Sequence, residues 1–243
     1  MKTITFKYEP DNCHIDPPLP ASQALPDWWK KMTVFKEGEP PWGSQGMKAC
    51  MPFFDAMVQG YMIPLWCDVH VKVGLDTDEN GEEATAPVFT WKEIGHTVIQ
   101  RHHSKQTEGF PLREQSATSG GTAYKFNNPW LIQTPPGYSS LFVAPLNNHN
   151  PNFQIISGIV ATDEYKTQIT FPFIWTGPDG YEGVIKEGTP IVQVIPFKRD
   201  DFKHELKAVD ENDRLLNMSA SRKLTQGFLG VYKKMWRRPT KSI

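Results

Sequence analysis

Residues 124–143 read YKFNNPWLIQTPPGYSSLFV, and this stretch holds three short apolar segments separated by two turn sequences. Tyr124–Phe126, Trp130–Thr134 and Ser139–Val143 have the aromatic and β-branched residues of strands. Asn127-Asn128-Pro129 and Pro135-Pro136-Gly137 have the residues of turns. Short strands with a turn about every eight to twelve residues indicate an all-β sandwich, jelly roll or barrel and not a parallel βαβ sheet.

The same alternation continues on both sides of this stretch. The further strands that we predict are Val69–Val73, Val88–Trp91, His96–His102, Phe153–Val160, Gln168–Trp175, Tyr181–Ile185 and Pro190–Phe197. Proline supports this assignment, because 21 of the 243 residues are proline, and proline is excluded from helix interiors and central strands. We therefore expect one all-β body with a jelly-roll-like architecture over residues 60–200.

The first 59 residues are predicted to form an N-terminal arm. Residues 1–8 alternate apolar and polar side chains as a strand does, and residues 9–48 are rich in proline. We expect one short helix at Asp27–Met32 and a second at Pro52–Gln59, which Gly60 ends. Trp28 and Trp29 point about 100° apart on a helix, so burying both requires contacts on two sides. We expect the arm to wrap the body or reach a neighbouring chain, with both tryptophans binding the partner.

Residues 201–243 form a basic C-terminal tail. From residue 217 to the end there are seven basic residues and no acidic one, whereas the other 216 residues have a net charge of −8. Leu224, Phe228, Val231, Tyr232 and Met235 recur at the spacing of one helical face, which predicts an amphipathic helix that needs a surface to lie on. Protein packing is favoured over nucleic acid or membrane, because the aromatic side chains require a groove. The predicted partner-binding residues of the tail are Phe228, Tyr232, Trp236, Arg237 and Arg238.

Composition excludes several classes of protein. No run of about eighteen apolar residues is present, so we expect no membrane-spanning helix. The first residues lack the apolar block of a signal peptide, and we expect the protein to stay in the cell that makes it. Cys13, Cys50 and Cys67 form no C-x-x-C pair and are expected to be reduced, mostly buried thiols.

Histidine spacing offers only a weak metal candidate. His96 and His102 would share one face of a predicted strand, but a metal site needs a third ligand. The only H-x-D sequence, His14-Ile15-Asp16, lies in the arm and not on a body strand. The acidic run that starts at Asp76 lacks the EF-hand pattern and is expected to be a solvated hairpin tip. We predict neither a bound metal nor a cofactor.

Three segments in series resemble the dUTPase and dCTP-deaminase superfamily. They are Thr134–Phe142, with Pro-Pro-Gly-Tyr; Gly158–Tyr165, with Gly-Ile-Val-Ala-Thr-Asp-Glu-Tyr; and Ile185–Phe197, with a Gly-x-x-Ile-x-Gln pattern. The resemblance covers residues 124–199 and implies a β-clip fold. It also implies a nucleotide site in which Gln193 bears on the nucleobase and Tyr165 stacks on the deoxyribose.

The catalytic residues of that superfamily are not matched. Its water-activating aspartate would fall at Ala161 or Thr162, neither of which can accept a proton as a carboxylate does. Asp163 is adjacent, but a slip of one residue along a strand turns a side chain to the opposite face. The Arg-Ser-Ser phosphate motif is also missing after Phe142, and no phosphate-binding loop or nucleophile elbow occurs elsewhere. The resemblance therefore implies the fold without the activity.

The whole chain also resembles an uncharacterised family encoded by tailed bacteriophages, most clearly over residues 125–139 and 189–199. Our leading hypothesis is a non-enzymatic virion structural component that binds neighbouring subunits, as a homo-oligomer and by analogy with its fold relatives a trimer. It would be in the host cytoplasm during synthesis and then in the virion. The first alternative is a nucleotide-binding or nucleotide-hydrolysing enzyme with a site at Tyr165, Gln193 and Asp163. The second is a metal-dependent oxygenase around His96 and His102.

Overall fold

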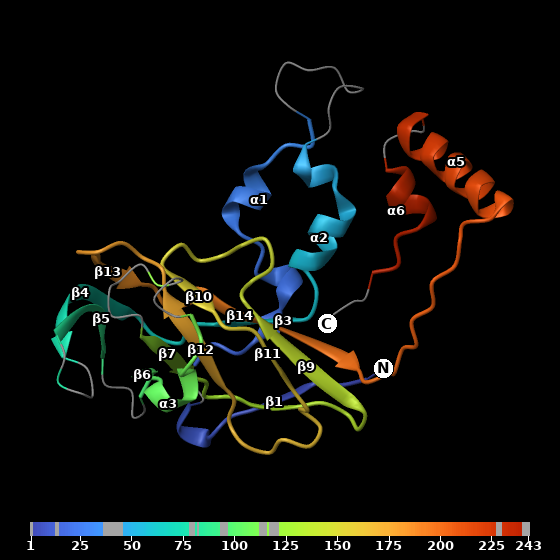
Figure 1. Ribbon diagram of the computed structural model, residues 1–243. Helices are drawn as coiled ribbons and strands as arrows, with labels where there is room; N and C mark the ends of the chain where they lie inside the picture. The colour runs from blue at the N-terminus through green and yellow to red at the C-terminus, as the bar shows by residue number, and fades with distance from the viewer. Residues whose placement is uncertain are drawn as a thin grey trace. The chain divides into compact units, whose positions relative to one another are not determined.

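The computed structural model describes residues 2–12, 15–35, 46–77, 81, 83–92, 97–111, 116, 122–226 and 230–239. Within them the fold is mostly β, with several antiparallel sheets and helices near the C-terminus (Figure 1). The described residues divide into two compact units. Residues 2–24 and 57–199 form the first unit, and residues 25–56 and 200–239 form the second.

The first unit contains a five-stranded sheet with β14 at its centre. The order is β11 (Gly158–Val160), β9 (Tyr138–Val143), β14 (Pro190–Lys198), β3 (Tyr61–Pro64) and β2 (Leu19–Pro20). The nine residues of β14 pair with β9 on one side and with β3 on the other. Its apolar run is typical of a strand buried on both faces, and Ile191–Val194 is fully buried.

The remaining strands form three smaller antiparallel sheets. These are β10 (Phe153–Ile155), β12 (Thr170–Trp175), β7 (Ala123–Asn127) and β6 (Ile99–Arg101); then β13 (Glu182–Ile185), β4 (Val69–Thr77) and β5 (Glu83–Trp91); and the pair β1 (Thr5–Lys7) and β8 (Leu131–Gln133). The unit also contains the short helix α3 (Ser104–Thr107) and the 3₁₀ turns η1 (Pro10–Asn12) and η2 (Ala21–Gln23).

Aromatic side chains from several strands fill the core of the first unit. Phe126, Phe171, Phe173 and Trp175 are at most 1% exposed, and the rings of Phe126 and Phe173 stack with centroids 4.4 Å apart. β4 and β5 pair along their full length, from Val69 opposite Trp91 to Thr77 opposite Glu83. Asp76 and Glu83, the first and last acids of the acidic run, therefore lie at the end of this hairpin, and the acids between them lie outside the described residues.

Two strand predictions need correction. Phe153–Val160 is not one strand but two, β10 and β11, which lie in different sheets. The chain changes sheets at residues 156–157, where the amide of Ile156 donates to the carbonyl of Pro172 at 2.8 Å and β11 then pairs with β9. The strand predicted at His96–His102 is shorter, since β6 ends at Arg101, and His96 lies outside the described residues.

The second unit contains the first predicted arm helix, α1 (Asp27–Lys31), the 3₁₀ turn η3 (Met47–Ala49) and all but the last residue of the second arm helix, α2 (Met51–Met57). Only one of the adjacent tryptophans is buried: Trp29 is 4% exposed, whereas Trp28 is 40% exposed. The first part of the predicted arm belongs to the other unit, because β1 pairs with β8 and β2 pairs with β3.

The prediction of one continuous helix through Leu224 and Met235 is wrong. The tail contains α5 (Glu211–Gln226) and α6 (Val231–Met235), and Gly230 before α6 has φ +80°, a left-handed conformation that interrupts a helix. α5 begins at a reciprocal cap, because Asp213 N donates to Asp210 Oδ1 at 2.8 Å and Asp210 N donates to Asp213 Oδ2 at 3.3 Å. No helix among the described residues is both long and apolar enough to cross a membrane.

Candidate functional site

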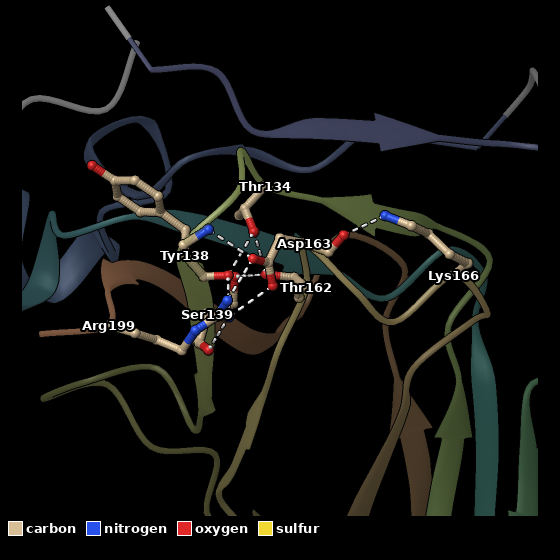
Figure 2. Close-up of polar contacts among 9 residues, drawn as sticks. Thr134, Tyr138, Ser139, Thr162, Asp163, Lys166 and Arg199 are labelled. Carbon is tan, nitrogen blue, oxygen red and sulfur yellow. Dashed lines mark hydrogen bonds and ion pairs between the residues drawn. The ribbon is translucent and has the colours of Figure 1, made fainter.

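Residues of two segments, Thr134–Phe142 and Gly158–Tyr165, form a compact polar cluster with Arg199 at one end of β9 and β14 (Figure 2). After β11 the chain makes a tight turn, in which the amides of Glu164 and Tyr165 both donate to the carbonyl of Ala161, at 2.9 and 2.8 Å. This turn directs the side chain of Asp163 toward the start of β9 and the end of β14. The carboxyl of Asp163 is only 3% exposed.

Asp163 is held by a bidentate ion pair and a backbone amide. Arg199 donates from Nη1 to Oδ1 at 2.7 Å and from Nη2 to Oδ2 at 2.6 Å, and Gly137 N donates to Oδ2 at 2.8 Å. These hydrogen bonds favour the ionised carboxylate, and Arg199 holds the pKa of Asp163 well below its usual range. A carboxylate so paired is a weak base, so Asp163 is poorly suited to activate a water molecule.

Arg199 fastens the same cluster to β9. Its Nη1 also donates to the carbonyl of Tyr138 at 3.0 Å and to Ser139 Oγ at 3.1 Å. Lys166 Nζ donates to the backbone carbonyl of Asp163 (Figure 2). These contacts join the turn after β11 to β9 and to the end of β14, and they therefore have a structural role.

Thr162, one of the two positions at which the sequence resemblance would place the aspartate, is completely buried. Its Oγ1 lies 2.7 Å from Thr134 Oγ1 and 3.0 Å from Ser140 Oγ, and Thr134 Oγ1 donates to the carbonyl of Tyr138 at 3.1 Å. The three hydroxyls therefore satisfy one another and the backbone. This hydrogen bonding is structural, because a buried hydroxyl without a partner is costly.

Gln193 is also fully buried, and it links two distant parts of the first unit. Its Oε1 accepts from the amide of Leu146 at 2.8 Å, and its Nε2 donates to the carbonyl of Gln59 at 2.6 Å. The predicted contact of this amide with a nucleobase is at odds with this burial.

The three residues of the predicted nucleotide site are not brought together. Gln193 and Arg199 are six residues apart along β14 and its end, which corresponds to about 20 Å. Asp163 pairs with Arg199, so it lies at the far end of the strand from Gln193. Tyr165 is 44% exposed and follows the turn. The structure therefore places these side chains in three different environments.

The histidines and cysteines form no reactive centre in the described part of the chain. His102 lies just after β6, His103 Nδ1 accepts from the amide of Lys105 at 3.2 Å, and His14 and His96 lie outside the described residues. No group of three or more His, Cys, Asp or Glu side chains among the described residues could hold a metal ion. Burial, followed by the charges of Glu187 and Asp68, raises the pKa of Cys67 to about 11, which makes it a poor nucleophile.

The remaining thiols differ from the prediction of mostly buried cysteines. Cys50 is exposed, whereas Cys67 is buried, and both are free. Cys13 lies outside the described residues.

Of the predicted partner-binding residues in the second unit, some make contacts within the chain and others are exposed. Arg237 is engaged within its own chain: it donates from Nε to Asp55 Oδ1 and Oδ2 at 2.9 and 3.0 Å and from Nη2 to Oδ1 at 2.5 Å. Its guanidinium also lies over the ring of Phe54, 5.7 Å from the centroid. Trp29 packs against Phe53 and Phe54 with ring centroids 5.7 Å away in both cases. Arg237 therefore links α2 to the chain after α6, and Trp29 packs α1 against α2.

Other predicted contact residues stay at the surface. Trp28, Tyr232 and Trp236 are between 37% and 40% exposed, and Arg238 is exposed. Phe228 lies outside the described residues. Sequence reasoning missed Asp55 and the two phenylalanines before it, although an acidic residue beside two aromatic residues in a short helix is a signal for an arginine partner.

Sequence reasoning also missed the exposed apolar residues in the first part of the tail. Residues 200–210 contain neither helix nor strand, and they lead to α5 (Figure 1). Every residue from 200 to 219 is exposed. This C-terminal extension, residues 200–226, has seven large apolar side chains that are more than half exposed.

Comparison of the chain with protein-family models gave no match, and comparison with the curated proteins gave none either.

Proposed function

We propose that this protein is a non-enzymatic assembly protein that binds other copies of itself through the C-terminal extension. The observation that carries the proposal is the exposure of large apolar side chains along this segment. Phe202 is 93% exposed and Leu206 is 91% exposed. The other members of this apolar set, all more than half exposed, are Val209, Leu215, Leu216, Met218 and Leu224.

Single exposed apolar residues are ordinary on a protein surface, but a series of them along one short segment is typical of an interaction site. α5 has 16 residues, so it is about 24 Å long. Full burial of a leucine against a partner contributes about 2 kcal/mol. Leu216 and Leu224 are 61% and 54% exposed, so together they could contribute about 2 to 3 kcal/mol to association, roughly a thirty- to hundred-and-fiftyfold effect.

The distribution of charge favours a second copy of the chain as the partner. Residues 217–243 have seven positive charges and no negative one, and the other 216 residues have a net charge of −8. One copy therefore has both a basic segment and an acidic remainder, and these are complementary between copies. A nucleic-acid partner would use the basic residues but would leave the leucines of α5 exposed.

The buried polar groups also favour assembly over catalysis. Asp163 is paired with Arg199, and the amide of Gln193 is bonded to the backbone at both ends. A nucleotide site would need these groups to face a ligand.

The biological setting that we propose is a tailed-phage virion, with synthesis in the host cytoplasm, and the resemblance over residues 125–139 and 189–199 supports it. The dUTPase-like pattern supports a β-clip body, a jelly-roll relative, and by analogy a trimer.

The test replaces the leucines of α5 without changing charge or helix propensity. Leu216→Gln/Leu224→Gln removes apolar surface, and Asn212→Gln/Ser219→Gln on the same helix is the matched control. Sedimentation velocity should show wild type and control as oligomers and the leucine variant shifted toward the 27.7 kDa single chain. Circular dichroism should show that all three are equally folded, because the replaced side chains are exposed.

A wild-type chain that sediments only as a single copy at tens of micromolar would refute the proposal. So would a leucine variant with unchanged assembly. A thermal-shift screen with nucleoside triphosphates tests the enzyme alternative in parallel, since a ligand at about 100 times its dissociation constant stabilises a protein by about 2.7 kcal/mol. Stabilisation by a triphosphate would count against a purely structural role.

A further inference from the structure

One face of α5 has apolar side chains at helical spacing. Leu216, Ala220 and Leu224 follow one another at intervals of four residues, so both leucines lie within about 40° of Ala220 around the helix axis. Leu216 is 61% exposed and Leu224 is 54% exposed, whereas Ala220 between them is partly buried. The three residues form an apolar strip about 12 Å long, and most of its leucine surface is open to a partner.

The small side chain at the middle of the strip favours another helix as the partner. A second helix can come close to α5 at Ala220, because the distance between packed helices depends on the side chains at their contact. Its own large side chains must then lie on either side of Ala220. α5 of another copy has this arrangement, since its leucines flank an alanine. When the two helices are antiparallel with Ala220 opposite Ala220, Leu216 of each copy lies opposite Leu224 of the other.

The charges beside the strip favour this antiparallel orientation over a parallel one. Asp213 lies at the N-terminal end of the strip and Lys223 at its C-terminal end, and both are exposed and within about 60° of Ala220 around the axis. In an antiparallel pair each Asp213 lies about 6 Å along the axis from Lys223 of the other copy. In a parallel pair like charges would lie side by side, which is unfavourable. The helix dipoles also favour the antiparallel orientation, because opposite ends then lie together.

Both charged groups are available for this pairing. Within the described residues, no Asp or Glu oxygen lies within 4 Å of the ammonium group of Lys223. Asp213 accepts from the amide of Asp210 with Oδ2, and an ionised carboxylate can accept several further hydrogen bonds.

The arginines of α5 lie on another side of the helix. Arg214 and Arg222 are more than 100° from Ala220 around the axis, and they line a shallow hollow together with Met218. A nucleic acid bound to these arginines would leave the apolar strip exposed. A second copy of α5 covers the strip, so it is the partner that accounts for the exposed leucines.

We propose that α5 of one copy pairs with α5 of a second copy, antiparallel and centred on Ala220. This inference rests on the proposed self-assembly through the C-terminal extension, and it adds the orientation and the register of one contact. The same residues of both copies form the contact, so it is isologous and joins copies in pairs. The trimer that we propose by analogy would use a separate surface on the β body.

Spin labels test the orientation and the register. In a chain with Cys13→Ser and Cys50→Ser, which keeps the buried Cys67, one new cysteine is introduced by Ser219→Cys or by Asn212→Cys and is modified with a nitroxide. Both positions are exposed and lie on the same side of the strip. In the antiparallel pair the two labels are separated along the axis by about 3 Å for residue 219 and by about 24 Å for residue 212.

Electron paramagnetic resonance spectra of the associated chain should therefore show strong dipolar broadening for the label at residue 219 and little for the label at residue 212. Dilution with an excess of unlabelled chain should remove the broadening, because each chain has one label. Leu216→Gln/Leu224→Gln in the chain labelled at residue 219 should remove it as well. Sedimentation velocity checks that the labelled chains associate as wild type does.

Lys223→Glu tests the charge argument independently. This variant should associate roughly two- to thirtyfold more weakly than wild type at low salt, because two exposed ion pairs are lost in each contact. The control is Lys92→Glu, which makes the same change in net charge at an exposed lysine of the first unit and should associate as wild type does. Sedimentation velocity measures both variants, and the difference between them should decrease as salt is added.

Equal broadening at residues 212 and 219 would indicate parallel pairing, and broadening at neither would mean that α5 is not the contact. Either result would overturn this pairing and leave the proposed self-assembly standing, whereas a wild-type chain that never associates would remove both. Association of Lys223→Glu as strong as that of its control would also overturn the pairing. Broadening at residue 219 that appears only when a mixed-sequence DNA duplex is added would assign the contact to nucleic acid and refute the inference.

Discussion

Replacement of Gln193 by methionine tests whether this residue has a structural role. Gln193→Met keeps the length and approximate volume of the side chain but removes both hydrogen-bonding atoms. The amide of Leu146 then loses its acceptor at 2.8 Å, and the carbonyl of Gln59 loses its donor at 2.6 Å. If Gln193 has a structural role, Gln193→Met should lower the free energy of unfolding. If Gln193 binds a nucleobase, the change should mainly weaken ligand binding.

The expected magnitude follows from the two backbone groups left without partners. Each buried group without a hydrogen bond costs about 1 to 3 kcal/mol. Leu146 and Gln59 are only partly buried, so the lower half of this range applies and the sum is about 2 to 4 kcal/mol. For a chain of this size, 1 kcal/mol lowers the Tm by about 2 to 4 °C, so Gln193→Met should unfold roughly 4 to 16 °C below wild type.

The assay is urea unfolding followed by circular dichroism, with Gln154→Met as the control. Gln154 lies on β10 with an exposed side chain, so its replacement removes no buried hydrogen bond and should change the free energy of unfolding by less than about 0.5 kcal/mol. A Gln193→Met variant as stable as this control would refute the reasoning. Equal m-values for the two variants would show that the denatured states are comparable.

Two further substitutions test the local geometry. Gly60→Ala should destabilise the protein by more than about 2 kcal/mol in the same urea assay, because Gly60 has φ +71° and a Cβ there would lie 2.1 Å from the carbonyl oxygen of Val194. Gly74→Ala is its control and should be nearly neutral, since a Cβ there meets nothing within 4 Å. Asp163→Asn should lower the free energy of unfolding at neutral pH. It should also make that free energy depend less on pH in the acid range. The pKa of Asp163 is depressed, so its contribution is complete above the ordinary pKa of about 4 and disappears as pH falls through the folded-state value. The measurement is the urea midpoint of wild type and of the variant, at pH 7 and below about pH 4. If the two proteins differ by the same amount at both pH values, this assignment is contradicted.

Local patterns were enough to predict most of the strands. The turns at Gly137 and Gly60 depend on neighbouring residues, and both glycines have positive φ as such turns require, although α2 ends at Met57 and not at the predicted Gln59. The change of sheet at residues 156–157 could not be predicted in this way. It depends on a hydrogen bond to Pro172 and on pairing with Phe142, and neither is visible in an apolar run.

The polar contacts were harder to predict, because they join residues far apart in the chain. Asp163 and Arg199 are 36 residues apart, Gln59 and Gln193 are 134 apart, and Asp55 and Arg237 are 182 apart. Residue type indicates that a buried amide or carboxylate needs a partner, but not which partner. Assigning Gln193 and Asp163 to a ligand was therefore the natural interpretation of the sequence, and the structure gives each of them partners within the protein.

The environment of Thr162 explains why a carboxylate at that position would not by itself recreate a water-activating site. The side chain is completely buried, with its hydroxyl between those of Thr134 and Ser140. A carboxylate there could accept two hydrogen bonds, but burial would favour its neutral form. The nearby guanidinium of Arg199 already forms both of its parallel bonds with Asp163. Catalysis would therefore require a different partner for that arginine and an opening to solvent, which means changes in three chain segments at once.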